Sequence, residues 1–228
     1  MRWISEFQLF LFDLDGLLVN TEELHYGAYK RMLKQRGYTL PWDFIKYFGI
    51  AQQDAEAPKR HIYAEFPELY KSEPDWSVLY AEKKQAYLDL LQSEAAPLMP
   101  GVEELLGLLE QKNVKRAVVT HSAKALVDAL CKKNPTLRTI PHWITREDYA
   151  MPKPAPDGYL KAIRDFAEPG DRVIGFEDSS RGLRSLMATP ATPILVNAID
   201  ASLQQTTKAQ GVKVFTSFID VLKQDSLL

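Results

Sequence analysis

The chain has 228 residues, of which 46% are hydrophobic and 25% are charged, and its formal net charge at pH 7 is −2. This length suits one core domain with a modest insertion, and the charge, without a Lys/Arg cluster interleaved with aromatics, provides no basic surface for nucleic acid. Because no N-terminal apolar segment and no run of about 18 apolar residues occurs, and the single cysteine cannot form an internal disulfide, we expect a cytoplasmic protein without a signal peptide or membrane contact.

The first informative segment is LFLFDLDGLLVNT, residues 9–21, in which an apolar strand pattern ends in Asp13 and Asp15, followed by Gly16. Residues i and i+2 of an extended chain face the same side. Both charges therefore point into one space at the carboxyl end of the strand, where open α/β sheets bind ligands. Two carboxylates held this close require a cation or a shared proton. The alternative is a strand that runs into an Asp-Gly turn capped by its own acids.

Helical patterning follows the first motif. One face of the first predicted helix is apolar and carries Leu24, Ala28, Met32 and Leu33. That helix should stop at Gly37, and the sequence that follows is rich in aromatic residues and poor in strand patterns. We therefore predict a small α-helical cap over residues 20–93. It is inserted into a doubly wound, Rossmann-like α/β core with a parallel sheet, built from residues 1–19 and 94–228.

Three later segments place further polar groups at strand ends or in a restricted loop. The strand pattern VKRAVV ends in Thr120, a hydroxyl donor, and Lys153 lies between two prolines whose rings restrict the backbone. The strand pattern RVIGF ends in Glu177 and Asp178, before a Ser/Gly-rich turn. Together with the first acids, these groups suit Mg²⁺-assisted phosphoryl transfer, which needs a carboxylate nucleophile, a second carboxyl, oxygen ligands and a fixed cation.

In this order the four motifs resemble those of the haloacid dehalogenase-like hydrolase superfamily, within its phosphatase and β-phosphoglucomutase-like branch. The resemblance covers nearly the whole chain and rests on DLDGLLVNTEELH, Thr120, KPAPD and FEDSSRG. It implies that Asp13 attacks phosphorus and becomes an aspartyl phosphate. It also implies that Asp15 protonates the leaving alkoxide and then activates water. An acid at this second position favours phosphate over halide, because a halide leaves without a proton.

The resemblance also implies a Mg²⁺ site. Its ligands would be the Asp13 carboxylate, the main-chain carbonyl of Asp15 and Asp178, with Glu177 ligating through water or orienting the shell.

Phosphate binding is implied for Thr120, His121 and Lys153. His121 stands where many members have Asn, so its substrate contact departs from the family pattern. A second departure is MATPATPILV, in which two prolines replace the usual Gly turn. We expect the prolines to affect only the connection to the next strand.

Substrate choice is expected to depend on the cap, through Thr21, His25 and Gln52. His25 resembles a mutase residue near the cap hinge, but it also fits an ordinary half-exposed helix histidine. Gln52 lies in the stretch that matches a mutase cap loop, and no cation stands there to hold a second phosphate. We therefore predict a monomeric Mg²⁺-dependent phosphatase of a small phosphorylated metabolite. A sugar-phosphate mutase of β-phosphoglucomutase type and a non-catalytic binding module on the same fold remain alternatives.

Overall fold

The computed structural model describes residues 2–54, 56–93 and 96–227. The chain divides into two compact units, of which the first contains Met1–Asn20 and Pro97–Leu228 and the second contains Thr21–Ala96. The predicted restart of the core at residue 94 lies outside the described residues.

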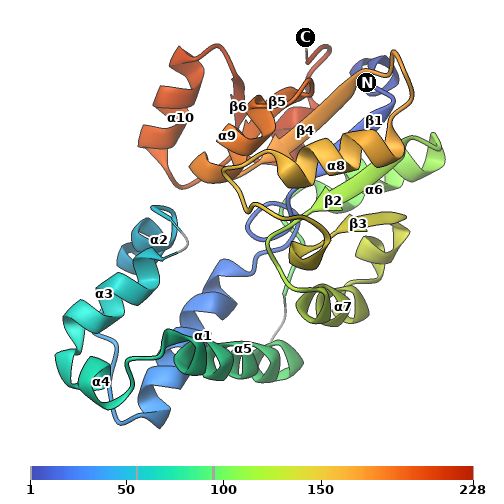
Figure 1. Ribbon diagram of the computed structural model, residues 1–228. Helices are drawn as coiled ribbons and strands as arrows, with labels where there is room; N and C mark the ends of the chain where they lie inside the picture. Colours follow the sequence, from blue (N-terminus) through green and yellow to red (C-terminus); the bar gives the residue numbers. More distant parts are fainter. Residues whose placement is uncertain (1, 55, 94–95, 228) are drawn as a thin grey trace. The chain divides into compact units, whose positions relative to one another are not determined.

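A six-stranded, all-parallel sheet forms the centre of the first unit, in the order β3-β2-β1-β4-β5-β6 (Figure 1). The strands are β1 Leu9–Phe12, β2 Lys115–Val119, β3 His142–Ile144, β4 Val173–Glu177, β5 Thr192–Val196 and β6 Lys213–Phe215. This strand order is that of doubly wound α/β folds, and it confirms the predicted fold class. The order reverses between β1 and β4, so the residues that follow these two strands meet at a topological switch point.

Helices connect the strands. The first unit contains η1 Trp3–Glu6, α6 Val102–Gln111, α7 Lys124–Lys133, η2 Pro135–Thr139, η3 Arg146–Asp148, α8 Asp157–Phe166, α9 Ser180–Met187, α10 Ala201–Ala209 and α11 Phe218–Leu222. In the described part of the chain, none of the helices combines the length and the apolar character that a bilayer crossing requires.

The two faces of β1 pack differently because its side chains alternate. Leu9 and Leu11 belong to the apolar cluster that includes Tyr159 of α8. On the other face, the ring of Phe12 packs edge-on against Phe218 of α11, with 6.1 Å between the ring centroids. Asp13 continues the alternation of Leu9 and Leu11, so its side chain emerges on the face covered by α8.

One local expectation was wrong. Pro193 lies inside β5, where it is paired in register with Gly175 of β4, rather than in the connection that precedes the strand. Proline has no N–H to donate, and the pairing of β5 with β6 begins only at Ile194, after Pro193.

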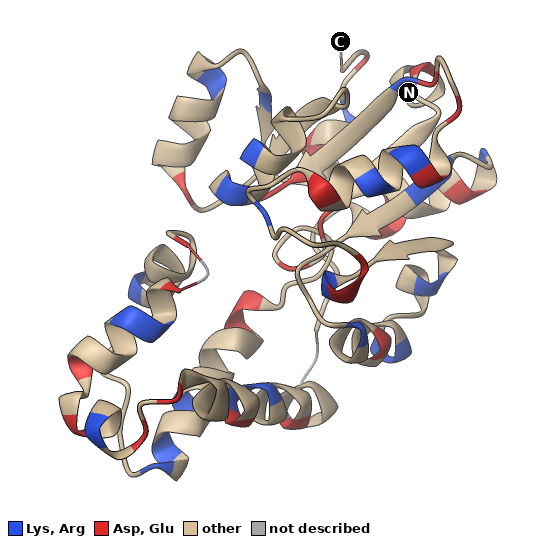
Figure 2. Cartoon of the chain, in the orientation of Figure 1, with Lys and Arg blue, Asp and Glu red and all other residues tan. Residues whose placement is uncertain are grey.

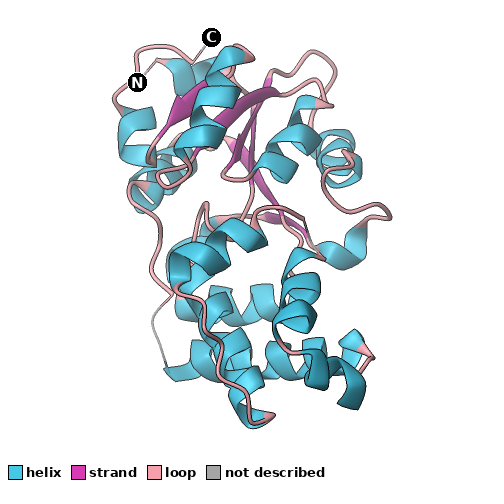
Figure 3. Ribbon diagram, turned by 90° about the vertical axis from the view of Figure 1, so that its left-hand side faces the viewer, coloured by secondary structure: helices cyan, strands magenta, loops and turns pink. Residues whose placement is uncertain are grey.

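The second unit is helical in its described residues (Figure 3). Its helices are α1 Glu22–Gln35, α2 Phe44–Ala51, α3 Ala57–Glu65, α4 Pro67–Ser72 and α5 Trp76–Ser93. The predicted apolar face of the first helix is confirmed, because Leu24, Ala28, Met32 and Leu33 are all buried. Gly37, with φ of 85°, adopts the left-handed conformation that ends the helix region. Acidic and basic residues are interspersed over both units (Figure 2).

Candidate active site

The turn after β1 presents the two predicted catalytic acids. The Asp13 N–H donates to the carbonyl of Phe176 on β4 (3.1 Å), so the backbone of Asp13 is fixed to the strand on the other side of the switch point. Gly16 has a φ of 83°, which favours glycine. Its N–H donates to the Val19 carbonyl (2.9 Å) and closes the turn that carries Asp15. Asp13 is buried, and Asp15 is half-buried.

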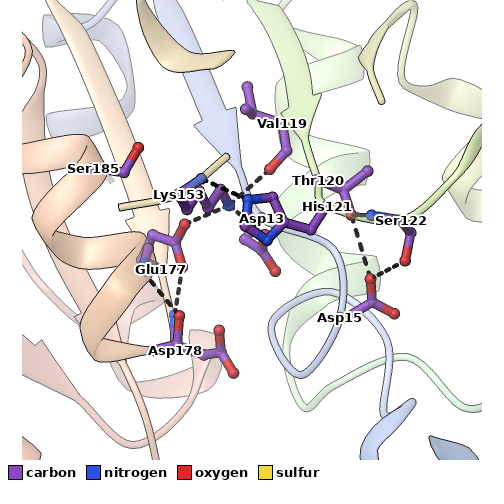
Figure 4. A network of polar contacts seen from close by, with 12 residues as sticks. Asp13, Asp15, Val119, Thr120, His121, Ser122, Lys153, Glu177, Asp178 and Ser185 are labelled. Atoms are coloured by element: carbon purple, nitrogen blue, oxygen red, sulfur yellow. Dashed lines mark hydrogen bonds and ion pairs between the residues drawn. The ribbon is translucent and has the colours of Figure 1, made fainter. Parts of the chain in front are cut away.

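A single cation lies between two carboxylates in this site (Figure 4). Lys153 Nζ lies 2.5 Å from Asp13 Oδ1 and 2.6 Å from Glu177 Oε1, and it also donates to the Val119 carbonyl at 2.9 Å. Only 7% of the Lys153 residue is exposed. The structure therefore brings together three of the residues predicted from separate motifs.

These charges shift the pKa values in the site. Burial, together with the negative charges of Glu177 and Asp15, raises the pKa of Asp13 to about 7 despite the neighbouring Lys153. The two carboxylates raise the pKa of Lys153, more than offsetting its burial. Lys153 therefore stays charged, whereas Asp13 holds a proton at mildly acidic pH when no cation is bound.

The acids of this site fit a divalent cation. Oxygen atoms of Asp13, Glu177 and Asp178 lie within 4.8 Å of one another, and all three residues are buried. Three carboxylates and one ammonium group leave two uncompensated negative charges when all are ionised. A hard divalent cation would neutralise them, and carboxylate oxygens are the ligands that Mg²⁺ prefers.

Glu177 is fixed by a residue that the sequence analysis missed. The Tyr159 hydroxyl donates to Glu177 Oε1 at 2.5 Å, and burial raises the pKa of Tyr159 well above its usual range, so the hydroxyl keeps its proton. The Glu177 side chain is completely buried. Tyr159 lies six residues after Lys153, and an aromatic residue in a helix carries no sequence signal for this contact.

Gly182 of α9 packs directly behind Glu177, where a Cβ atom would overlap the carboxylate. The substitution Gly182→Ala should therefore displace Glu177 from Lys153 and Tyr159, and it should destabilise the protein by about 1–3 kcal/mol. Gly107→Ala in α6 is the matched control, since nothing lies near its Cβ position; it should stabilise by up to about 1 kcal/mol. Urea unfolding measures both changes, and an equally stable Gly182→Ala variant would contradict the close packing.

Asp15 lies against the loop after β2. Ser122 Oγ donates to Asp15 Oδ2 at 2.6 Å, and Thr120 Oγ1 lies 3.3 Å from the same oxygen. The Ser122 N–H donates to Thr120 Oγ1. Thr120 is therefore next to the second acid, as a shared site requires. Ser122 was missed because a serine in a loop carries no distinctive sequence signal.

Two further side chains at the carboxyl edge of the sheet form hydrogen bonds with backbone groups of predicted site residues. Asn197, which follows β5, donates through Nδ2 to the Asp178 carbonyl at 2.8 Å and so fixes a predicted metal ligand. His121 accepts the Lys153 N–H through Nε2 at 2.6 Å. The phosphate-binding role of His121 stays a prediction.

The three predicted cap residues belong to the helical unit. Thr21 is buried, and its carbonyl accepts the His25 N–H (2.9 Å) at the start of α1. The His25 ring has Nδ1 2.7 Å from Lys83 Nζ and stacks on Tyr87. Gln52 follows α2, and its N–H donates to the Phe48 carbonyl (3.0 Å). Their roles in substrate binding stay predictions.

The doubly wound sheet holds buried acids around a fixed lysine at its switch point, which is where α/β enzymes of this type place their active sites. The family model for haloacid dehalogenase-like hydrolases matches residues 10–192, and the chain belongs to this family. The predicted family and the prediction of a hydrolase are thereby confirmed.

Individual relatives agree with this assignment. The chain is 28% identical over 193 residues to Protein CbbY of Rhodobacter capsulatus, covering 83% of this chain and 85% of that protein. It is 29% identical over 217 residues to the probable pseudouridine-5'-phosphatase of Drosophila melanogaster, covering 92% and 89%. The crystal structure of CbbY from Rhodobacter sphaeroides in complex with phosphate has a TM-score of 0.77 and 23% identity, covering 94% of this chain and 96% of that one.

Proposed function

We propose that this chain is a phosphoric monoester hydrolase, a Mg²⁺-dependent phosphatase that acts on a small phosphorylated metabolite. The observation that carries the proposal is Lys153 Nζ between Asp13 and Glu177, at the carboxyl edge of the sheet. A cation fixed there can bind phosphoryl oxygens beside a carboxylate nucleophile. The Drosophila relative, named as a probable pseudouridine-5'-phosphatase, supports this class of reaction.

The proposed reaction has two displacements. An Asp13 oxygen attacks phosphorus, the bond from phosphorus to the alkoxide oxygen breaks, and Asp15 gives its proton to that oxygen. Water, deprotonated by Asp15, then attacks the aspartyl phosphate, releases inorganic phosphate and restores the Asp13 carboxylate. Thr120 and Lys153 bind the phosphoryl oxygens in this proposal.

The same proposal assigns the Mg²⁺ ligands to the Asp13 and Asp178 carboxylates and the Asp15 main-chain carbonyl, with Glu177 ligating through water or orienting the other ligands. Bound there, the ion would offset negative charge on the phosphoryl group.

Magnesium affinity should depend on pH, because the raised pKa of Asp13, about 7 without a bound cation, means that a proton must leave when Mg²⁺ binds. Below this pKa the apparent affinity falls with pH. Lowering the pH from 8 to 6 should therefore weaken Mg²⁺ binding about tenfold. Titration calorimetry in buffers of different ionisation enthalpy measures the affinity and the released proton together. Asp13→Asn should remove the pH dependence. If the Mg²⁺ affinity of the parent does not change between pH 6 and pH 8, the prediction is contradicted.

We further propose that the helical unit acts as a cap that selects the substrate through Thr21, His25 and Gln52. The expectations of a monomer, a cytoplasmic location and no nucleic-acid or membrane partner also stay predictions.

The proposed function is tested by phosphate release from a panel of sugar phosphates, nucleoside monophosphates and phosphoglycolate, with Mg²⁺ or with excess chelator. A phosphatase releases phosphate from at least one monophosphate, needs Mg²⁺, and needs no bisphosphate activator. Conversion of β-glucose 1-phosphate to glucose 6-phosphate with negligible phosphate release, and only with a bisphosphate, would establish a mutase instead. No turnover of any ester with Mg²⁺ would support the binding module.

A further inference from the structure

Two loops of the active-site edge are joined by one hydrogen bond. The loop after β2 carries His121, and the loop before α8 carries Lys153. The Lys153 N–H donates to His121 Nε2 at 2.6 Å (Figure 4). This contact is made to the backbone of Lys153, while the Lys153 side chain contacts Asp13 and Glu177. Through this hydrogen bond, His121 is connected to Asp13 and Glu177 by way of Lys153.

The lysine loop has few backbone donors. Between Met151 and Asp157 the sequence reads Pro-Lys-Pro-Ala-Pro. Because proline has no N–H, only Lys153 and Ala155 can donate from this stretch. The Ala155 N–H donates to the Pro152 carbonyl inside the loop (3.0 Å). The Lys153 N–H is therefore the donor that connects this stretch to another part of the sheet unit, and His121 receives it.

A second contact holds the other side of the loop. Ser185 of α9 donates through Oγ to the Ala155 carbonyl at 2.7 Å, and the Ser185 residue is only 1% exposed. His121 and Ser185 thus fix the backbone on both sides of the Lys153–Pro154 bond. Because the buried Lys153 side chain has little room to change rotamer, a shift of its backbone is passed on to the ammonium group.

The chemistry of the ring suits this contact. A histidine nitrogen accepts a hydrogen bond only when it carries no proton, so Nε2 requires a neutral ring protonated on Nδ1. Burial and the cations Lys153, Arg181 and Arg146 together lower the pKa of His121 to about 3, although Asp15 acts in the opposite direction. The ring therefore remains a hydrogen-bond acceptor at every pH at which the fold is expected to work.

We propose that His121 is a positioning residue whose neutral ring, through Nε2, fixes the backbone of Lys153 and keeps Nζ between Asp13 and Glu177. This inference rests on the proposed phosphatase function. It assigns His121 a role through Lys153, instead of the direct contact with phosphate expected from its place after Thr120.

Two substitutions separate the acceptor from the volume of the ring. Gln carries its amide oxygen about as far from the backbone as Nε2, whereas Leu fills space but accepts no hydrogen bond. His121→Leu should lower kcat about ten- to a hundredfold, the scale expected when a reacting group is misplaced, and change KM little. His121→Gln should stay within about threefold of the parent. His142→Leu on β3 is the control and should leave kcat unchanged, and thermal unfolding confirms that each variant is folded.

A double-mutant cycle tests whether the effect passes through the lysine. In a Lys153→Met background, His121→Leu should cause no further loss of activity. A further loss as large as in the parent, or a raised KM with an unchanged kcat, would mean that His121 binds the substrate directly, and it would overturn the proposal.

A readout without substrate keeps the inference distinct from the proposed function. Nitrogen–proton correlation spectra of the folded protein should show the His121 ring protonated on Nδ1 and not on Nε2. The ammonium resonance of Lys153 should shift in His121→Leu but not in His121→Gln. Protonation of Nε2, or an unchanged Lys153 resonance in His121→Leu, overturns the positioning role. Failure of the parent to hydrolyse any phosphate ester overturns the proposed function while these spectra still decide the contact.

Discussion

Asp13→Asn should abolish turnover, with kcat lowered at least about 10⁴-fold, because an amide cannot supply the attacking oxygen of a covalent mechanism. The change is nearly isosteric, and Lys153 can still donate to the side-chain oxygen of Asn. It also removes one of two carboxylates that share a single cation. The variant should therefore unfold at the same temperature as the metal-free parent or at a higher one.

Steady-state phosphate release and thermal unfolding measure the two parts of this prediction. Asp165→Asn on α8 is a matched control, because Asp165 pairs with Lys161 on the surface of the same unit. It should leave turnover unchanged. Activity of Asp13→Asn within tenfold of the parent would refute Asp13 as the nucleophile.

Lys153→Met should have the second large effect, because it removes the cation from two buried carboxylates while keeping much of the side-chain volume. The loss of charge stabilisation should lower kcat by about 10³-fold. In the metal-free protein, Asp13 and Glu177 would be left buried without their partner. Leaving buried charges uncompensated costs about 3–5 kcal/mol of the free energy of unfolding.

The stability loss should depend on pH in a defined direction. Without Lys153, the pKa of Asp13 rises further above that of an unfolded aspartate, so the folded state binds protons more tightly than the unfolded state as the pH falls. Replacing Lys153 should therefore lower the free energy of unfolding most above neutral pH and less in mild acid. Urea unfolding at pH 8 and pH 6 with chelator measures this difference, with Lys161→Met as the control. An equal, small loss at both values would contradict the shared-cation arrangement.

Much of the site could be predicted because sequence motifs coincide with strand ends. Parallel strands bring their carboxyl ends to one edge, so Asp13 after β1 and Glu177 and Asp178 at the end of β4 were expected to be neighbours. The apolar period of α1 likewise predicts its buried face. Local periodicity and the right-handed connection of parallel strands do not depend on the details of packing, so both can be inferred from the sequence.

Partners that depend on packing could not be predicted in the same way. Tyr159 and Ser185 carried no sequence signal, yet Tyr159 donates to Glu177 and Ser185 donates to the loop that carries Lys153. The contact of the His121 ring with the Lys153 backbone also had no sequence signal. Pro193 was placed in a connection but lies in β5. Each depends on which surfaces meet after folding.

The sequence by itself determined the fold class, the family and the chemical groups at the carboxyl edge, because these follow from hydrophobic period and from residues next to strand ends. Only the tertiary structure decided how those groups share charge. Lys153 lies 140 residues from Asp13 in the chain but in ion-pair contact with it. The strength of such a contact depends on its burial and on the neighbouring carboxylates. Both depend on how α8 and α9 pack against the sheet, and no local sequence pattern specifies that packing.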